Sequence, residues 1–292
     1  MSRRPEVVVG GLLFPEGPVW CADGTVVCTS VAEGALYRVW PRESRKERIA
    51  EVGGGANAAA PADDGGFLVT QNGGIDFGAI GLYEDPPPYR PATPGVQRVE
   101  SDGSVSYLLE GGFLAPNDLV VATDGTLFFT DPPHHPPPPE SMGRVHAYRD
   151  GQLRTLADGF AYCNGIALEP DSTVVVVEGN GLMRVGPDGS KEWVCKLPGA
   201  SGDGFCLDVD GNFYVATAAD HGVLILDSEG VVIDFLPISD GGAGGGIVTN
   251  CCFGGEDGRT LFATDGIPGQ LVAWEGLPVP GREIYPWPTA TR

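Results

Sequence analysis

One spacing recurs along this chain and narrows the folds that it can adopt. Six times, a carboxylate or carboxamide side chain lies seven residues before an acidic residue: Glu16 with Asp23, Asn57 with Asp64, Asn117 with Asp124, Asn164 with Asp171, Asp203 with Asp210, and Asn250 with Asp257. In five of these pairs a glycine follows the second acid, and in the fourth pair Ser172 follows it. An Asp-Gly pair between two extended runs is a strong signal for a β-hairpin. The pattern therefore predicts six hairpins that share one register.

Strand-like segments surround each of these turns. Short β-rich runs follow the turn acids, at 25–29, 66–70, 126–130, 173–177, 212–217 and 260–264. A second set of apolar segments opens near a glycine or another small residue, at 35–40, 95–99, 143–148, 181–185, 222–226 and 269–274. Most of these continue into another turn and strand, so each repeat supplies about four strands. No long stretch carries a helical apolar stripe, and the chain is expected to be all-β.

The distances between the turn acids indicate a closed ring of repeats. They are 41, 60, 47, 39 and 47 residues, which suits a four-stranded propeller blade with insertions in the second and third units. The sequence thus predicts a single domain over residues 1–292, a six-bladed β-propeller of four-stranded antiparallel blades. Residues 7–9 are expected to complete the last blade. The 45 glycines and 26 prolines agree with a chain that is dense in turns.

Two long insertions, at about 71–94 and 131–142, follow the second strands of blades two and three. The second strand of a blade returns to the face from which the first began, so both insertions are expected beside one mouth of the channel. Both are rich in proline, which reduces the entropy of ordering a loop over a ligand. We expect a wall or lid in which Asp131, His134 and His135 are candidate substrate contacts. Exposed loop histidines and a hairpin-stabilising aspartate are the alternative explanation.

Charge and cysteine content exclude several classes of partner. The net charge is −21, from 18 basic and 39 acidic residues, and such a field repels the phosphate backbone of nucleic acids. No apolar run is long enough to cross a bilayer and the start of the chain has no signal-peptide core, so a cytoplasmic location is the default expectation. Seven cysteines without CxxC spacing argue against a disulfide framework or a zinc knuckle.

The six residues that open the hairpins are candidates for a metal site. In a propeller the first strand of each blade lies innermost, so a residue just before it faces the channel and six of them converge. Here they are two carboxylates and four carboxamides, whose oxygen atoms suit a hard cation. Calcium is preferred, with Mg²⁺, Mn²⁺ and Zn²⁺ as alternatives. Asn57 and Asn250 are the weakest metal-ligand candidates and are predicted to contact substrate. Turn preference alone explains any single Asn or Asp, but Glu16 is a poor turn former.

The residues around these positions resemble the motifs of the senescence-marker-protein/gluconolactonase/luciferin-regenerating-enzyme family. The matching segments occur in the family's order over essentially the whole chain: Glu16-Gly17-Pro18, Pro116-Asn117-Asp118, Asn164-Gly165-Ile166-Ala167, Gly202-Asp203-Gly204, and Thr249-Asn250 with Phe253-Gly254-Gly255. The resemblance implies a six-bladed propeller that holds a divalent cation, often calcium, and hydrolyses lactones or related esters.

The family's functional residues can be carried over position by position. Its metal-binding Glu, Asn and Asp correspond to Glu16, Asn164 and Asp203, and its additional channel Asn, a metal or substrate contact, corresponds to Asn117. Sugar-lactone members have an Arg two places before that Asn, where this chain has Ala115. The resemblance therefore implies the metal site without implying a sugar substrate.

The expected mechanism uses the cation as a Lewis acid on the carbonyl of a small lactone or ester while water attacks. Asp203 is the candidate general base. The alternative is that the ion itself acidifies the water and Asp203 only orients it. Two other function classes stay open: related chemistry at the same cation, such as phosphotriester hydrolysis or a ring-opening step, and a non-enzymatic propeller that binds calcium or a protein partner.

Overall fold

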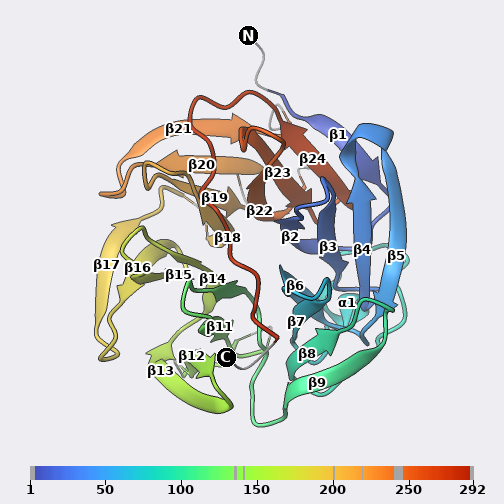
Figure 1. The fold of residues 1–292 in the computed structure, drawn as a ribbon, viewed down its shortest axis with the longest axis horizontal. Helices are drawn as coiled ribbons and strands as arrows, with labels where there is room; N and C mark the ends of the chain where they lie inside the picture. The colour runs from blue at the N-terminus through green and yellow to red at the C-terminus, as the bar shows by residue number, and fades with distance from the viewer. Residues whose placement is uncertain are drawn as a thin grey trace.

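The computed structural model describes residues 4–134, 137–140, 142–199, 201–218, 220–239 and 246–289. They form six four-stranded antiparallel sheets arranged radially around a central axis (Figure 1), which confirms the predicted fold. Each of the first five blades is built from four strands that are consecutive in the chain. The sixth blade takes its outermost strand from the start of the chain.

The strands have the following bounds. Blades I to III contain β2 (Pro15–Trp20), β3 (Val26–Ser30), β4 (Ala35–Trp40), β5 (Arg45–Glu51), β6 (Ala56–Pro61), β7 (Phe67–Gln71), β8 (Gly95–Val99), β9 (Val105–Glu110), β10 (Leu119–Val121), β11 (Leu127–Asp131), β12 (Gly143–Arg149) and β13 (Gln152–Phe160). Blades IV to VI contain β14 (Cys163–Leu168), β15 (Val174–Glu178), β16 (Gly181–Val185), β17 (Lys191–Lys196), β18 (Gly202–Leu207), β19 (Phe213–Thr217), β20 (Gly222–Leu226), β21 (Val232–Pro237), β22 (Val248–Gly254), β23 (Thr260–Asp265), β24 (Gln270–Trp274) and β1 (Glu6–Gly10).

Ring closure is achieved by the N-terminal strand. β1 pairs antiparallel with β24, with Val7 opposite Val272, so the prediction that residues 7–9 complete the last blade is confirmed. Apolar side chains from blades VI and I then pack against each other, among them Val26, Leu271 and Phe262. Burial of this shared core joins the two ends of the ring, because apolar surface removed from water stabilises the closed form.

Five of the six hairpin acids accept a backbone N–H of their own turn, and in the fifth hairpin Asp208 does so in place of Asp210. In the fourth hairpin Asp171 Oδ1 accepts the backbone N–H of Thr173 at 2.9 Å, and Asp124 accepts that of Thr126 in the same way. Gly125 follows with a φ of +84°, a left-handed conformation that glycine adopts without strain. The Asp-Gly pairs therefore mark the turns between the first and second strands of the blades, as predicted.

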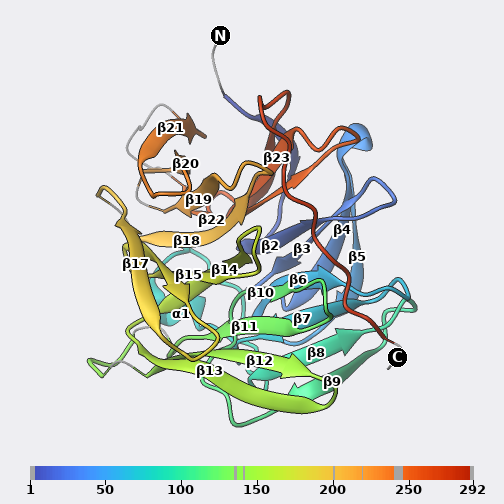
Figure 2. The same ribbon diagram turned by 60° about the vertical axis from the view of Figure 1, so that its left-hand side comes forward.

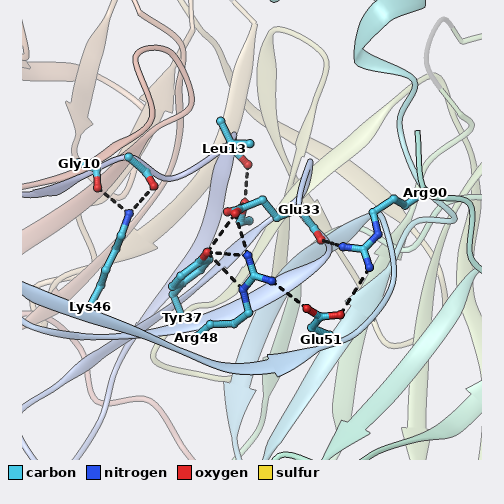
Figure 3. Close-up of polar contacts among 10 residues, drawn as sticks. Gly10, Leu13, Glu33, Tyr37, Lys46, Arg48, Glu51 and Arg90 are labelled. Atoms are coloured by element: carbon cyan, nitrogen blue, oxygen red, sulfur yellow. Dashed lines mark hydrogen bonds and ion pairs between the residues drawn. The ribbon is translucent and has the colours of Figure 1, made fainter. Parts of the chain in front are cut away.

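The insertion at 71–94 packs onto blade I. It contains the short helix α1 (Phe77–Ile80), which is capped by Asp76. Phe77 is buried against Phe14, with 5.1 Å between the ring centroids. Arg90 donates to the backbone carbonyl of Glu33 at 2.6 Å and also reaches Glu51 (Figure 3). These contacts fix the insertion against the propeller.

The chain beyond β24 crosses the end of the channel where the hairpin turns lie (Figures 1 and 2). Gly281 forms a bridge with Asp208 of blade V, and Trp287 forms one with Ala62 of blade II. Trp287 donates to the carbonyl of Pro61 at 2.8 Å and accepts from the N–H of Asp63 at 3.0 Å. The segment therefore spans the ring between two distant blades, a feature that the repeat pattern did not predict.

Helix content adds little to the architecture. Among the residues that the structure describes, α1 is accompanied by one 3-10 turn, η1 (Pro41–Glu43). Within the described part of the chain, no helix has both the length and the apolar character needed to span a membrane. All seven cysteines are free thiols.

Candidate active site

The six residues that open the hairpins are called the ring residues below: Glu16, Asn57, Asn117, Asn164, Asp203 and Asn250. Five of them occupy the second or third position of an innermost strand, rather than the position just before it. Asn117 alone precedes its strand, β10. The strand pairing of β2, β6, β14 and β18 is irregular at this point, with register shifts after Glu16, Ala56, Cys163 and Gly202. A bulge re-aims the side chains beside it. These residues therefore lie at one end of the inner strands, but five of them lie two or three residues further into the strand than the sequence predicted.

Three carboxyl groups share this end of the channel. Burial raises the pKa of Glu16 well above its ordinary value, and the nearby charges of Asp203 and Asp118 raise it further. Burial and the charge of Asp118 likewise raise the pKa of Asp203, against a hydrogen bond from Asn164. Burial raises the pKa of Asp118 to about 7, although Asn250 stabilises its charged form. Like charges held together out of water disfavour ionisation, so a positive charge bound among the three carboxyl groups would stabilise their ionised forms.

Two of the amides present oxygen atoms that have no partner. Asn117 Oδ1 and Asn164 Oδ1 are buried and accept no hydrogen bond from the described residues. A buried acceptor without a donor costs about 1–3 kcal/mol. Such a cost is removed when the oxygen coordinates a cation. The predicted ligand role would give each of these two oxygen atoms a partner.

Asn250 is oriented differently. Its Oδ1 accepts the backbone N–H of Cys251 at 2.8 Å, which identifies the other end of the amide as the donor. That donor, Nδ2, lies 3.0 Å from each oxygen of Asp118. Asn250 thus holds Asp118, a residue adjacent to Asn117 that the sequence analysis did not select. The signal that could have found Asp118 is the Asn117-Asp118 pair itself, which puts two oxygen-bearing side chains at a ring position.

The donor set fits a hard divalent cation. Glu16 and Asp203 would supply two carboxylates, and Asn117 and Asn164 two amide oxygens, which is a set that calcium accepts. No cluster of three or more His, Cys, Asp or Glu side chains with metal-site geometry occurs among the described residues.

Threonine side chains tie the ring together across the blades. Thr130, in the second strand of blade III, donates to the carbonyl of Asn164 at 2.6 Å and accepts the N–H of Asp118 at 3.1 Å. Thr70 makes the equivalent pair of contacts, to the carbonyl of Asn117 and the N–H of Ala58. Thr29 donates to the carbonyl of Asn57 at 2.7 Å. The sequence analysis missed this role, although each threonine lies six residues after a turn acid.

Asp131 holds the loop that leads to Asn117. Its carboxylate is fully buried and accepts the N–H groups of Leu114 and Ala115, each at 2.8 Å. It also contacts Arg144 at 2.7 Å and His146 at 3.2 Å. These contacts occupy both oxygen atoms of the predicted substrate contact, and they fit the stabilising alternative.

Two histidines, His134 and His135, lie in the second insertion. His134 is exposed, and its ring lies beside Gly73, so the two insertions meet. His135 lies outside the described residues. Glu178 repeats the arrangement of Asp131 in blade IV, where it accepts the N–H groups of Ala161 and Tyr162 just before Asn164. An acid at the end of the second strand thus orders the approach to two of the ring amides.

A cavity of about 140 Å³ lies in the channel behind the ring. Its lining includes Asp118 and Asn250, residues 282–285 of the C-terminal segment, and mostly small or apolar side chains of the inner strands. The C-terminal segment therefore covers the channel end opposite the ring.

Comparison with known proteins identifies the family of the chain. Residues 14–266 match the family model described as the SMP-30/gluconolactonase/LRE-like region. The chain is 27% identical over 290 residues to a gluconolactonase of Zymomonas mobilis, covering 90% of this chain and 79% of that protein. It is 25% identical over 283 residues to regucalcin of Xenopus laevis, covering 89% and 85%.

Solved structures show the same fold. A luciferin-regenerating enzyme is similar with a TM-score of 0.77 and 16% identity, covering 95% of this chain and 96% of that one. A gluconolactonase of Xanthomonas campestris is similar with a TM-score of 0.73 and 22% identity, covering 92% and 89%. The family match spans most of the propeller, including all six ring positions. The chain belongs to the SMP-30/gluconolactonase/LRE-like family.

Proposed function

We propose that this protein is a divalent-metal-dependent hydrolase that opens a lactone, and that calcium is the metal. The observation that carries the proposal is the pairing of two partnerless amide oxygens, on Asn117 and Asn164, with the buried carboxyl group of Glu16 and the half-buried one of Asp203. Relatives named gluconolactonase and regucalcin support the substrate class. A structure described as that of a calcium-binding regucalcin, from Agrobacterium tumefaciens, supports the choice of ion.

A bound cation would supply Lewis-acid activation of the lactone carbonyl and of water. The chain itself contributes position and proton transfer. Glu16 is held by the backbone N–H of Gly17, which donates to its Oε2 at 2.8 Å. Asp203 is the candidate general base because its carboxylate would lie beside a water molecule held at the same cation. The alternative is that the cation itself acidifies this water and Asp203 only orients it. Asn117 and Asn164 would supply oxygen ligands that carry no charge.

A panel of lactones tests this function directly. Ring opening releases acid, so a pH indicator reports hydrolysis of γ-butyrolactone, δ-valerolactone and glucono-1,5-lactone. We expect turnover of at least one of them with calcium present and none after complete chelation. Activity that survives full metal removal would contradict the metal dependence. Inactivity on every lactone, with calorimetry showing calcium bound, would favour other chemistry at the cation or a non-enzymatic calcium-binding role. The proposed location of this activity is the cytoplasm.

A further inference from the structure

The side-chain amide of Asn57 has its orientation fixed by a chain of hydrogen bonds that starts from a backbone N–H group. The N–H of Gly74 donates to Asn72 Oδ1 at 3.0 Å. A backbone N–H can only donate, so the opposite end of the Asn72 amide is the nitrogen. That nitrogen, Nδ2, donates to Asn57 Oδ1 at 2.9 Å. The remaining end of Asn57 is therefore Nδ2, a hydrogen-bond donor.

This donor is buried and has no partner. Asn57 is 3% exposed, and its Nδ2 makes no hydrogen bond with any described residue. The unpartnered atoms of Asn117 and Asn164 are oxygens, whereas the unpartnered atom of Asn57 is a nitrogen that carries hydrogens. An amide nitrogen is not a ligand for a hard cation. The ring thus offers acceptors at two positions and a donor at a third.

Asn57 shares the register of the metal-ligand candidates. In β6 it follows Ala56, which pairs with Gln71, just as Glu16 in β2 follows Pro15, which pairs with Ser30. The two strands are neighbours, since a Cβ added to Gly17 would lie 2.8 Å from the carbonyl oxygen of Asn57. The side chain of Asn57 therefore belongs to the same end of the channel as Glu16.

The residue that orients Asn57 comes from the first insertion, and its surroundings are rigid. The N–H of Gly73 donates to Gln71 Oε1 at 3.0 Å, and the carbonyl of Gly73 accepts from Ala92 at 3.0 Å. Gly55 has a φ of +93°, and a Cβ there would lie 2.2 Å from Asn72 Oδ1. The backbone and Asn72 are thus packed too closely for the amide to move far.

We propose that Asn57 donates a hydrogen bond to an oxygen of the bound ester, and that Asn72 is the positioning residue that presents this donor. The inference rests on the proposed lactone hydrolysis. A lactone carries two acceptor oxygens and no donor in its reacting group, so a donor beside the carboxylates and amide oxygens completes the recognition of that group. The first insertion then acts in specificity through Asn72, in addition to any role as a wall.

The first experiment separates a substrate contact from a metal ligand. The variant N57A should lose about 10-fold to 100-fold in kcat/KM, as expected for one hydrogen bond to developing charge. Its calcium affinity, measured by calorimetry, should stay within about twofold of the wild type, whereas losing a ligand or its support costs about 10–100-fold in affinity. A weakening of calcium binding of that size in N57A would overturn the inference, and so would unchanged kcat/KM.

The second experiment reverses the amide. In N72D the new carboxylate has no N–H; one oxygen can still accept from Gly74, and the other can only accept from Asn57. Asn57 must then turn over and present Oδ1 instead of Nδ2. We expect kcat/KM to fall as in N57A while calcium affinity rises, because an extra oxygen faces the cation. The same substitution in the N57A background gives the purely electrostatic gain in calcium affinity, which should be smaller.

Equal gains in calcium affinity in the two backgrounds would refute the reorientation and with it the role of Asn72. Unfolding midpoints of all variants with chelator present establish that they are folded. The calcium measurement needs no turnover. If the wild-type protein opens no lactone, the proposed function fails, while the orientation of Asn57 is still decided by the comparison of N72D with and without Asn57.

Discussion

The two ends of each inner strand carry the same kinds of side chain, and the fold treats them in opposite ways. At the turn end, Asp171 is exposed, and hydrogen bonds from the backbone and side chain of Thr173 hold its pKa below the ordinary value. At the ring end, burial and the charge of Asp118 raise the pKa of Asp203 well above it. Turn acids are satisfied by their own backbone, whereas ring acids face one another. Chemistry is therefore expected only where the charge has no local partner.

The largest effect expected from this contrast is on catalysis. We expect D203N to reduce lactone hydrolysis by about 10³-fold or more, which corresponds to about 4 kcal/mol of transition-state free energy. The matched change at the turn end, D171N, should leave hydrolysis within about twofold. Kinetics and calcium calorimetry on both variants provide the measurement. Loss of turnover with calcium still bound supports Asp203 as the base, loss of calcium supports a ligand role, and full turnover in D203N would break the contrast.

The next largest effect is a pH dependence of stability in the calcium-free protein. Burial raises the pKa of Asp118 to about 7 in the folded state, from 3.8. As pH rises from about 4 to 7, the unfolded chain releases this proton before the folded chain does, so stability falls. The loss for Asp118 alone is about 3–4 kcal/mol. Glu16 and Asp203 act in the same direction because their pKa values are raised too.

Thermal unfolding with chelator at pH 5 and pH 8 measures this effect. The midpoint should be lower at pH 8, and D118N should reduce the difference. Saturating calcium should also reduce it, because a cation stabilises the charged carboxylates. A calcium-free protein that is equally stable at both pH values would show that the three carboxyl groups are not electrostatically strained.

Local sequence signals were sufficient for the strands that flank turns. The predicted segments 35–40, 95–99, 181–185 and 222–226 coincide with β4, β8, β16 and β20, because small residues mark where these strands begin. The Asp-Gly pairs located the hairpins for the same reason. Register then placed Glu16, Asn164 and Asp203 at one end of the channel. These are consequences of spacing along the chain, which a sequence displays directly.

Side-chain contacts that do not follow the repeat spacing could not be read in this way. Nothing local to Asn57 shows that Asn72 fixes its amide, and nothing near Asn250 shows that it holds Asp118, 132 residues away. The C-terminal segment has no place in the repeat, and its path over the channel depends on Asp208 and Ala62. Asp131 was predicted to contact substrate at the channel mouth. Its actual partners, the N–H groups of Leu114 and Ala115, lie in the loop before β10, and the sequence gives no sign of this contact.

A third prediction concerns Asp131, which is a buried acid with partners. We expect D131N to destabilise the protein by about 2–3 kcal/mol, since it removes the charge from hydrogen bonds to Arg144 and two N–H groups. The exposed turn acid Asp124 is the control, and D124N should change stability by less than about 1 kcal/mol. Denaturant unfolding measures both. If D131N loses activity at unchanged stability, the carboxylate contacts substrate as first predicted.

The smallest effect tests how the ring is held together. T130V keeps the shape of the side chain but leaves the Asn164 carbonyl and the Asp118 N–H without their shared hydroxyl. We expect a loss of about 1–1.5 kcal/mol in the free energy of unfolding, and weaker calcium binding, because both backbone groups carry ring residues. T130S restores the hydroxyl and should recover calcium affinity. If T130V destabilises the protein while calcium binds normally, the hydrogen bonds of the threonine hydroxyls support only the fold. The positions of the ring residues are then fixed by the bulges of the inner strands.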